Sequence, residues 1–174
     1  MPWIGNYSFA DIYNGRHAIE PGRTVLIRIA DIGHLFKETD VKLRAEFSAI
    51  HLFRFFDIEP EEVHDETQVG EIVPAQAVII EYILSEALNE GYNVVVHCNA
   101  GLCRSGAVAE VGVMMGFDDL RRPRTPNLFV KRLLMNQAGF NWNALFEQRM
   151  KEAACWLQCI LRINLTAVGM AGWS

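Results

Sequence analysis

The chain has 174 residues, of which 51% are hydrophobic and 21% are charged. This composition is typical of a globular domain and excludes disordered, collagen-like and coiled-coil chains. The net charge of −5 gives no reason to expect a nucleic acid or an anionic membrane as partner, so any anion site must be local. The 4 cysteines are too few for a disulfide scaffold and favour a reduced, cytoplasmic setting. Neither a basic nor an apolar stretch opens the chain, so we expect no signal peptide.

Strands and helices alternate along the sequence. Apolar and β-branched runs predict strands at residues 25–30, 47–56 and 93–97, and residues 57–72 are acidic and aperiodic, which predicts a loop. Apolar periodicity, with proline at two helix starts and glycine just past two helix ends, predicts helices at 74–89, 105–115, 126–137 and 142–165. We therefore expect an α/β fold with a central, mostly parallel sheet flanked by helices. No repeat or linker interrupts the chain, so residues 1–174 are expected to form a single domain.

The segment after the predicted strand 93–97 is the candidate site, because ligands of parallel sheets bind beyond the carboxyl ends of the strands. A junction of strand, loop and helix directs several backbone N–H groups and the positive helix end at one anion. Arg104 adds a planar fork for two phosphate oxygens, and the same groups would stabilise a thiolate at Cys98. The residues expected to bind the anion are Asn99, Ala100, Gly101, Leu102, Cys103 and Arg104.

The run from His97 and Cys98 to Arg104 and Ser105 resembles the signature of the cysteine-dependent protein phosphatases, in their compact dual-specificity form. The resemblance covers residues 24–140, including a helix opening with Pro126 and Asn127, and leaves 142–174 as a C-terminal helical extension. It implies a phosphatase-like fold with a phosphate loop and a cysteinyl-phosphate intermediate. Arg104 would hold the equatorial oxygens, Ser105 would ease departure of the thiolate, and His97 would support the loop.

The resemblance also implies an aspartate that protonates the leaving oxygen, and two residues compete for this role. Asp57 follows the predicted strand and lies 41 positions before Cys98, whereas Asp65 lies 33 positions before it. Position at a strand end favours Asp57, and spacing alone favours Asp65. We take Asp57 as the expected general acid and Asp65 as the alternative.

The function expected from this resemblance is hydrolysis of phosphotyrosine, and of phosphoserine or phosphothreonine if the specificity is dual, in a phosphorylated protein substrate. The alternatives are a phosphatase of another monoester (a nucleotide, an RNA end or an inositide), a sulfur-transfer or arsenate-reductase type of cysteine enzyme, and a phosphate-binding protein without activity. No basic residue precedes Arg104 in the loop, which disfavours an inositide. No cofactor is expected, and no metal, because neither cysteine pair has Cys-x-x-Cys spacing and Arg104 would repel a cation.

Three further features stay open in the sequence. Cys103, five positions after Cys98, resembles the second loop cysteine of the low-molecular-weight phosphatases, and either protects Cys98 from overoxidation or is inert. The apolar stretch 153–173 is expected to be a core-packing helix, with a homodimer face or a membrane-surface contact as alternatives. Arg162 argues against a membrane span. The one basic cluster is either a solvated face or a patch that attracts acidic substrates, and consists of Arg121, Arg122, Arg124, Lys131 and Arg132.

Overall fold

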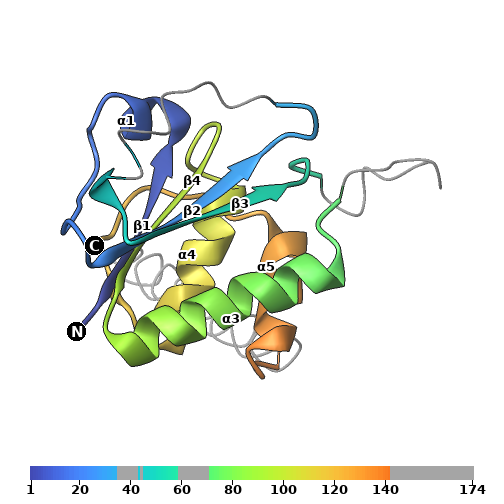
Figure 1. The fold of residues 1–174 in the computed structure, drawn as a ribbon. Helices are drawn as coiled ribbons and strands as arrows, with labels where there is room; N and C mark the ends of the chain where they lie inside the picture. The colour runs from blue at the N-terminus through green and yellow to red at the C-terminus, as the bar shows by residue number, and fades with distance from the viewer. Residues whose placement is uncertain (35–42, 44, 59–70, 142–174) are drawn as a thin grey trace, which may run out of the picture. The chain divides into compact units, whose positions relative to one another are not determined.

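A parallel sheet forms the centre of the fold in this computed structural model (Figure 1). The structure describes residues 1–34, 43, 45–58 and 71–141. Within these ranges the strand order is β3-β2-β4-β1-β5, and every neighbouring pair is parallel. The strands are β1 (Trp3–Ser8), β2 (Thr24–Ala30), β3 (Ala49–Arg54), β4 (Asn93–Cys98) and β5 (Asp118–Asp119). The expected α/β class with a parallel central sheet is confirmed.

Helices cover both faces of the sheet (Figure 1). The helices α3, α4 and α5 lie together on one face, and the short α1 lies on the other. Their bounds are α1 (Phe9–Tyr13), α3 (Pro74–Glu90), α4 (Arg104–Met115) and α5 (Leu128–Gln137). All of them belong to the compact unit Met1–Gly139; Phe140–Ser174 is divided from it as a second unit. No described helix is long and apolar enough to cross a membrane.

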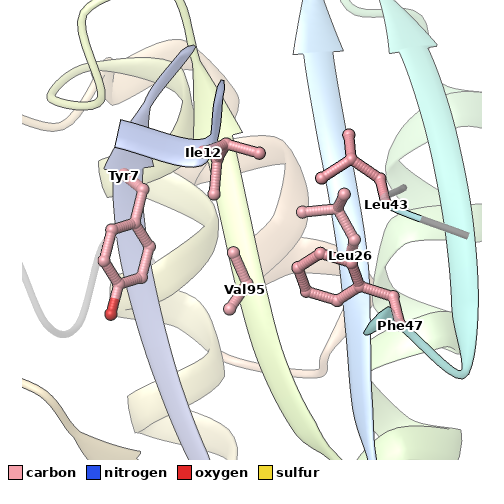
Figure 2. Packing of buried hydrophobic residues seen from close by; sticks show 6 residues of the cluster. All are labelled: Tyr7, Ile12, Leu26, Leu43, Phe47 and Val95. Atoms are coloured by element: carbon pink, nitrogen blue, oxygen red, sulfur yellow. The ribbon is translucent and has the colours of Figure 1, made fainter. Parts of the chain in front are cut away.

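The face of the sheet beneath α1 carries its own apolar cluster (Figure 2). Tyr7, Leu26 and Val95 come from β1, β2 and β4 and point to this same face. Because side chains alternate along a strand, the residues two positions further on, such as Arg28 and His97, belong to the same face. Fully burying one large apolar side chain contributes about 1.5–3 kcal/mol. The cluster is completed by Ile12, Leu43 and Phe47.

The N-terminal strand and helix are the main elements that the sequence did not reveal. The β1 segment includes Gly5 and Asn6, both of which are poor strand formers. It forms a strand because it pairs with β4 on one side and β5 on the other, which is a tertiary effect. The predicted helix 126–137 begins instead at Leu128, because the Asn127 side chain caps the Val130 N–H at 2.9 Å. The predicted helix at 142–165 lies outside the described residues.

A capping box starts α1 directly after β1. The Ser8 hydroxyl accepts from the Asp11 N–H at 3.0 Å, and the Asp11 carboxylate accepts from the Ser8 N–H at 3.3 Å. Burial by itself would raise the pKa of Asp11. The Ser8 hydrogen bonds and the charges of Arg122 and Arg16 outweigh it, so the pKa lies below its usual 3.8.

The depressed pKa of Asp11 predicts an acid-dependent contribution to stability. Its stabilisation is fully present above the unfolded-state pKa and is lost as the pH falls through the lower folded-state pKa. Asp11→Asn should reduce the free energy of unfolding by about 1 kcal/mol near neutral pH, since it removes the charge but keeps the shape. Urea unfolding at several pH values checks this prediction. An equal loss at acid pH, where the wild-type carboxyl is already protonated, would contradict it.

Candidate active site

Cys98 is the last residue of β4, and its sulfur lies beside the first turn of α4. The side chain is 1% exposed. Its Sγ accepts from the Gly101 N–H at 3.3 Å and lies 3.2 Å from the hydroxyl oxygen of Ser105, which is fully buried in the first turn of α4. The loop thus turns back onto the sulfur, with a backbone amide and a hydroxyl near it. Groups of this kind stabilise a thiolate.

The loop between β4 and α4 closes against the end of β1. Gly101 has a φ of +78°, and a Cβ atom at this position would collide with the backbone of Tyr7 and Ser8. Asn6, buried within β1, donates from Nδ2 to the Gly101 carbonyl at 2.7 Å and to the Pro123 carbonyl at 2.9 Å. No sequence pattern marks Asn6 as a functional residue, because the strand that contains it was not predicted either.

Arg104 opens α4 and is only 4% exposed. Its Nη1 donates to Asp31 Oδ1 at 2.7 Å and to the Phe55 carbonyl at 2.6 Å. Its Nε lies 3.9 Å from Asp57 Oδ2 and makes no hydrogen bond to the described part of the chain. These contacts hold one nitrogen of the guanidinium and leave the Nε–Nη2 edge available to two oxygens of an anion.

The structure places Asp57 beside Arg104, three residues after the end of β3. Its Oδ1 accepts from the Asn127 amide at 3.0 Å, which leaves Oδ2 as the oxygen that faces the guanidinium. The same amide group donates to the Ile58 carbonyl at 3.1 Å and so fixes the backbone next to the carboxylate. The rival Asp65 lies outside the described residues.

Asp31 is a site residue that the sequence analysis treated only as part of a turn. It follows β2 directly, bonds Arg104, and its side chain is 47% exposed. Because β2 lies next to β4, the carboxyl ends of the two strands meet at one edge of the sheet. Its place at that strand end was the signal that could have identified it.

A pocket of about 70 Å³ lies at this edge and reaches Cys98 and Asn99. Phe9 and His34 form an aromatic wall, with their ring centroids 5.8 Å apart and nearly perpendicular planes. Asp31 and His97 also line the pocket. Of the remaining loop residues, Ala100 and Leu102 are exposed. The pocket therefore offers an aromatic surface next to the buried sulfur.

Cys103 lies at the junction of the loop and α4, with its Sγ 3.7 Å from the Thr125 hydroxyl oxygen. Burial raises the pKa of the Cys103 thiol; the Thr125 hydrogen bond opposes this shift and the negative charge of Asp57 adds to it. The thiol form of Cys103 therefore prevails at neutral pH. Protection of Cys98 by Cys103 stays a prediction, and Cys155 and Cys159 lie outside the described residues.

The basic cluster is largely paired with acids in the structure. Three of its members each lie against a carboxylate, so little net positive charge is left for attracting a substrate. This disfavours the attracting patch, and the burial of Lys131 means that the cluster is not simply a solvated face either. The ion pairs of the cluster are Arg122 with Asp11, Arg124 with Asp119, and Lys131 with Glu110.

In the described ranges no group of three or more potential metal ligands is found.

Comparisons with known proteins found few likenesses. No family model matches the chain, and no curated protein matches it. Among solved structures it is similar to the active form of Tk-PTP, at 15% identity over 77% of each chain with a TM-score of 0.41. A glycine-to-alanine mutant form of Tk-PTP is 17% identical over 92% of this chain and 93% of that one, with a TM-score of 0.39.

The contact of the loop with β1 predicts a strong effect of Gly101→Ala. The positive φ alone should cost about 1–3 kcal/mol, and the clash with the β1 backbone adds to it. Thermal unfolding measures the loss, and phosphate binding measured by calorimetry should weaken with it. Gly15→Ala is a matched control, because Gly15 also has a positive φ but no atom near its Cβ position. Equal losses in the two variants would show that the contact with β1 contributes nothing.

Proposed function

We propose that the chain is a phosphomonoester hydrolase that uses Cys98 as its nucleophile. One observation carries the proposal: the Cys98 sulfur meets Ser105 and the Gly101 N–H at the start of the helix that Arg104 opens. A phosphate bound to the open edge of Arg104 and to the loop amides would lie above the sulfur. This places a nucleophile and an electrophilic phosphorus together, which is the geometric requirement for covalent catalysis.

The first step forms a sulfur–phosphorus bond and breaks the bond between phosphorus and the leaving oxygen. The Cys98 thiolate supplies the electron pair, and Asp57 supplies the proton that the leaving oxygen takes. Arg104 and the loop amides bind the equatorial oxygens as they gain charge, which stabilises the transition state. The product alcohol leaves, and the phosphoryl group remains on the sulfur.

The contacts of Asp57 support its role as the acid. A phosphate dianion at the open edge of Arg104 would lie close to Oδ2, and repulsion between the two would favour protonation of the carboxyl. Since Asn127 donates to Oδ1, the proton belongs on Oδ2, the oxygen that faces the bound phosphate. A carboxyl protonated there can donate to the leaving oxygen.

The second step transfers the phosphoryl group to water. The Asp57 carboxylate takes a proton from the water, the new oxygen–phosphorus bond forms, and the sulfur–phosphorus bond breaks to return the thiolate. The Ser105 hydroxyl, 3.2 Å from the sulfur, can donate to the departing thiolate and so assist this step. Inorganic phosphate and the original form of Cys98 result.

The aromatic wall favours phosphotyrosine among the phosphorylated side chains. Phe9 and His34 can stack against a phenyl ring, whereas phosphoserine would leave this surface exposed. We therefore place the chain as a protein phosphatase acting on phosphotyrosine, with dual specificity as the wider form of this proposal. Sulfur transfer and arsenate reduction also use a cysteine in an anion site, but neither requires the acid at Asp57.

Cys98→Ser tests the nucleophile. The rate of aryl phosphate hydrolysis should fall by about 10³-fold or more, because a serine hydroxyl is far less ionised and a poorer leaving group. Phosphate should still bind, since Arg104 and the loop remain, and calorimetry measures this. Cys155→Ser is the matched control for loss of a thiol elsewhere in the chain. Substantial turnover by Cys98→Ser would exclude a covalent mechanism.

Comparison of Asp57→Asn with Asp31→Asn tests the acid. Asp57→Asn should slow alkyl phosphate hydrolysis by about 10²–10⁴-fold and activated aryl phosphates much less, because only poor leaving groups need the proton. Asp31→Asn should instead impair both substrates equally, since Asp31 contacts Arg104 rather than the leaving group. If Asp31→Asn alone shows the leaving-group dependence, the two assignments are reversed. If neither does, Asp65 or a reaction without an acid becomes the better explanation.

A further inference from the structure

Arg28 is a buried cation for which the proposed reaction has no use. It lies within β2, between apolar neighbours in the run Val-Leu-Ile-Arg-Ile-Ala, and is 4% exposed. Burying a guanidinium is costly unless its N–H groups are hydrogen-bonded. A chain that keeps arginine at this position therefore needs a specific partner for it.

One such partner is the imidazole of His97. Arg28 Nε donates to His97 Nε2 at 3.2 Å, and both side chains are buried. The two residues are direct partners in the parallel register of β2 and β4, two positions beyond Leu26 and Val95, which Figure 2 shows on the face beneath α1. The contact is thus set by the sheet register, with little freedom for either ring or guanidinium to move.

The chemistry of the two groups decides where the imidazole proton lies. A guanidinium has only donors and is not deprotonated in proteins, so the nitrogen that faces it has to be an acceptor. A neutral imidazole accepts at one nitrogen and carries its proton on the other, whereas an imidazolium has N–H groups at both. With Nε2 accepting from Arg28, the proton of His97 belongs on Nδ1, and protonation of Nε2 would set two N–H groups against each other.

We propose that Arg28 is a positioning residue that holds His97 as the neutral Nδ1–H tautomer. The imidazole beside Cys98 then carries no charge between about pH 5 and pH 8, where histidines ordinarily titrate. His97 precedes Cys98 in β4 and lines the same pocket. Because its ring stays neutral, the electrostatic field that it exerts on the sulfur stays constant over this pH range. The proposal goes beyond the proposed function and does not depend on it.

The other groups around His97 are consistent with a neutral ring. Phe9 packs against it, with the ring centroids 6.0 Å apart, and provides an apolar surface. Tyr7 is its register partner on β1, and that hydroxyl accepts from the Ala18 N–H at 3.0 Å. Among the residues that the structure describes, the other titratable groups lining the pocket of His97 and Cys98 are Asp31 and His34. Asp31 bonds Arg104 at 2.7 Å, so its carboxylate already has a cationic partner.

The test is a long-range ¹⁵N–¹H spectrum of the uniformly labelled full chain, recorded as the pH is varied from about 5 to 8. We expect His97 to show a pyrrole-type Nδ1 and a pyridine-type Nε2 that do not change over this range. A protonated Nε2, or titration of His97 within the range, would overturn the proposal. The wild-type chain alone is enough to determine the protonation state and tautomer of His97.

Two variants identify Arg28 as the cause. Arg28→Met keeps an unbranched side chain but removes the donor, so His97 should begin to titrate within the range or change tautomer. Arg54→Met is the matched control, because Arg54 is an exposed arginine on the neighbouring β3 and should leave His97 unchanged. An unaltered His97 in a folded Arg28→Met chain would exclude the role of Arg28.

A second measurement relates the tautomer to the nucleophile. The rate of Cys98 alkylation by iodoacetamide is measured against pH in the wild type and in Arg28→Met. The Arg28→Met profile should gain an inflection, absent from the wild type, at the pH where the spectrum shows His97 titrating. Alkylation needs no phosphoester turnover, so its outcome and that of the Cys98→Ser experiment are independent. A profile unchanged in Arg28→Met, although His97 titrates, would show that the ring does not affect the sulfur.

Discussion

The loop after β4 can return onto the Cys98 sulfur only because residue 101 has no side chain. Gly101 lies so close to the backbone at the end of β1 that any Cβ would displace the strand. Asn6 holds the same peptide through its carbonyl, and the Phe9 N–H donates to the Asn99 carbonyl at 3.1 Å. The start of α4, the direction of Arg104 and the position of Ser105 all follow from this closure.

A single guanidinium then connects the ends of three strands. Arg104 comes from the helix after β4, bonds Asp31 beyond β2, and reaches Phe55 and Asp57 beyond β3. Two carboxylates near one cation give this site a net negative charge, so an incoming dianion has to change the protonation or position of one of them. Asp57 is the better candidate, because its Oδ2 is 3.9 Å away rather than tightly bonded. In the proposed mechanism, binding and proton transfer are linked through this arrangement.

The two faces of the sheet have separate roles at the site. Cys98 meets Ser105 of α4, whereas His97 and Arg28 lie two positions beyond Val95 and Leu26, on the face of the apolar cluster beneath α1. Successive residues of β4 point to opposite faces, so the nucleophile and its neighbouring imidazole are adjacent in the chain but have different surroundings.

The sequence by itself determined the local features. Apolar β-branched runs, helix periodicity and the glycine and proline positions predicted the central strands and three of the described helices, because these signals depend on neighbours in the chain. The spacing from Cys98 to Arg104 and Ser105 placed three groups of the candidate site together, since they occupy one strand–loop–helix junction.

Only the tertiary structure decided what depends on distant segments. β1 is a strand because β4 and β5 pair with it, and Asn6 matters because it reaches a loop 95 residues away. The partnership of Asp31 with Arg104, and of Arg28 with His97, likewise arises from strand register, since parallel strands bring residues about 70 positions apart into contact. A single sequence carries no local signal for such contacts, because the free energy that favours them comes from burial and pairing in the folded sheet.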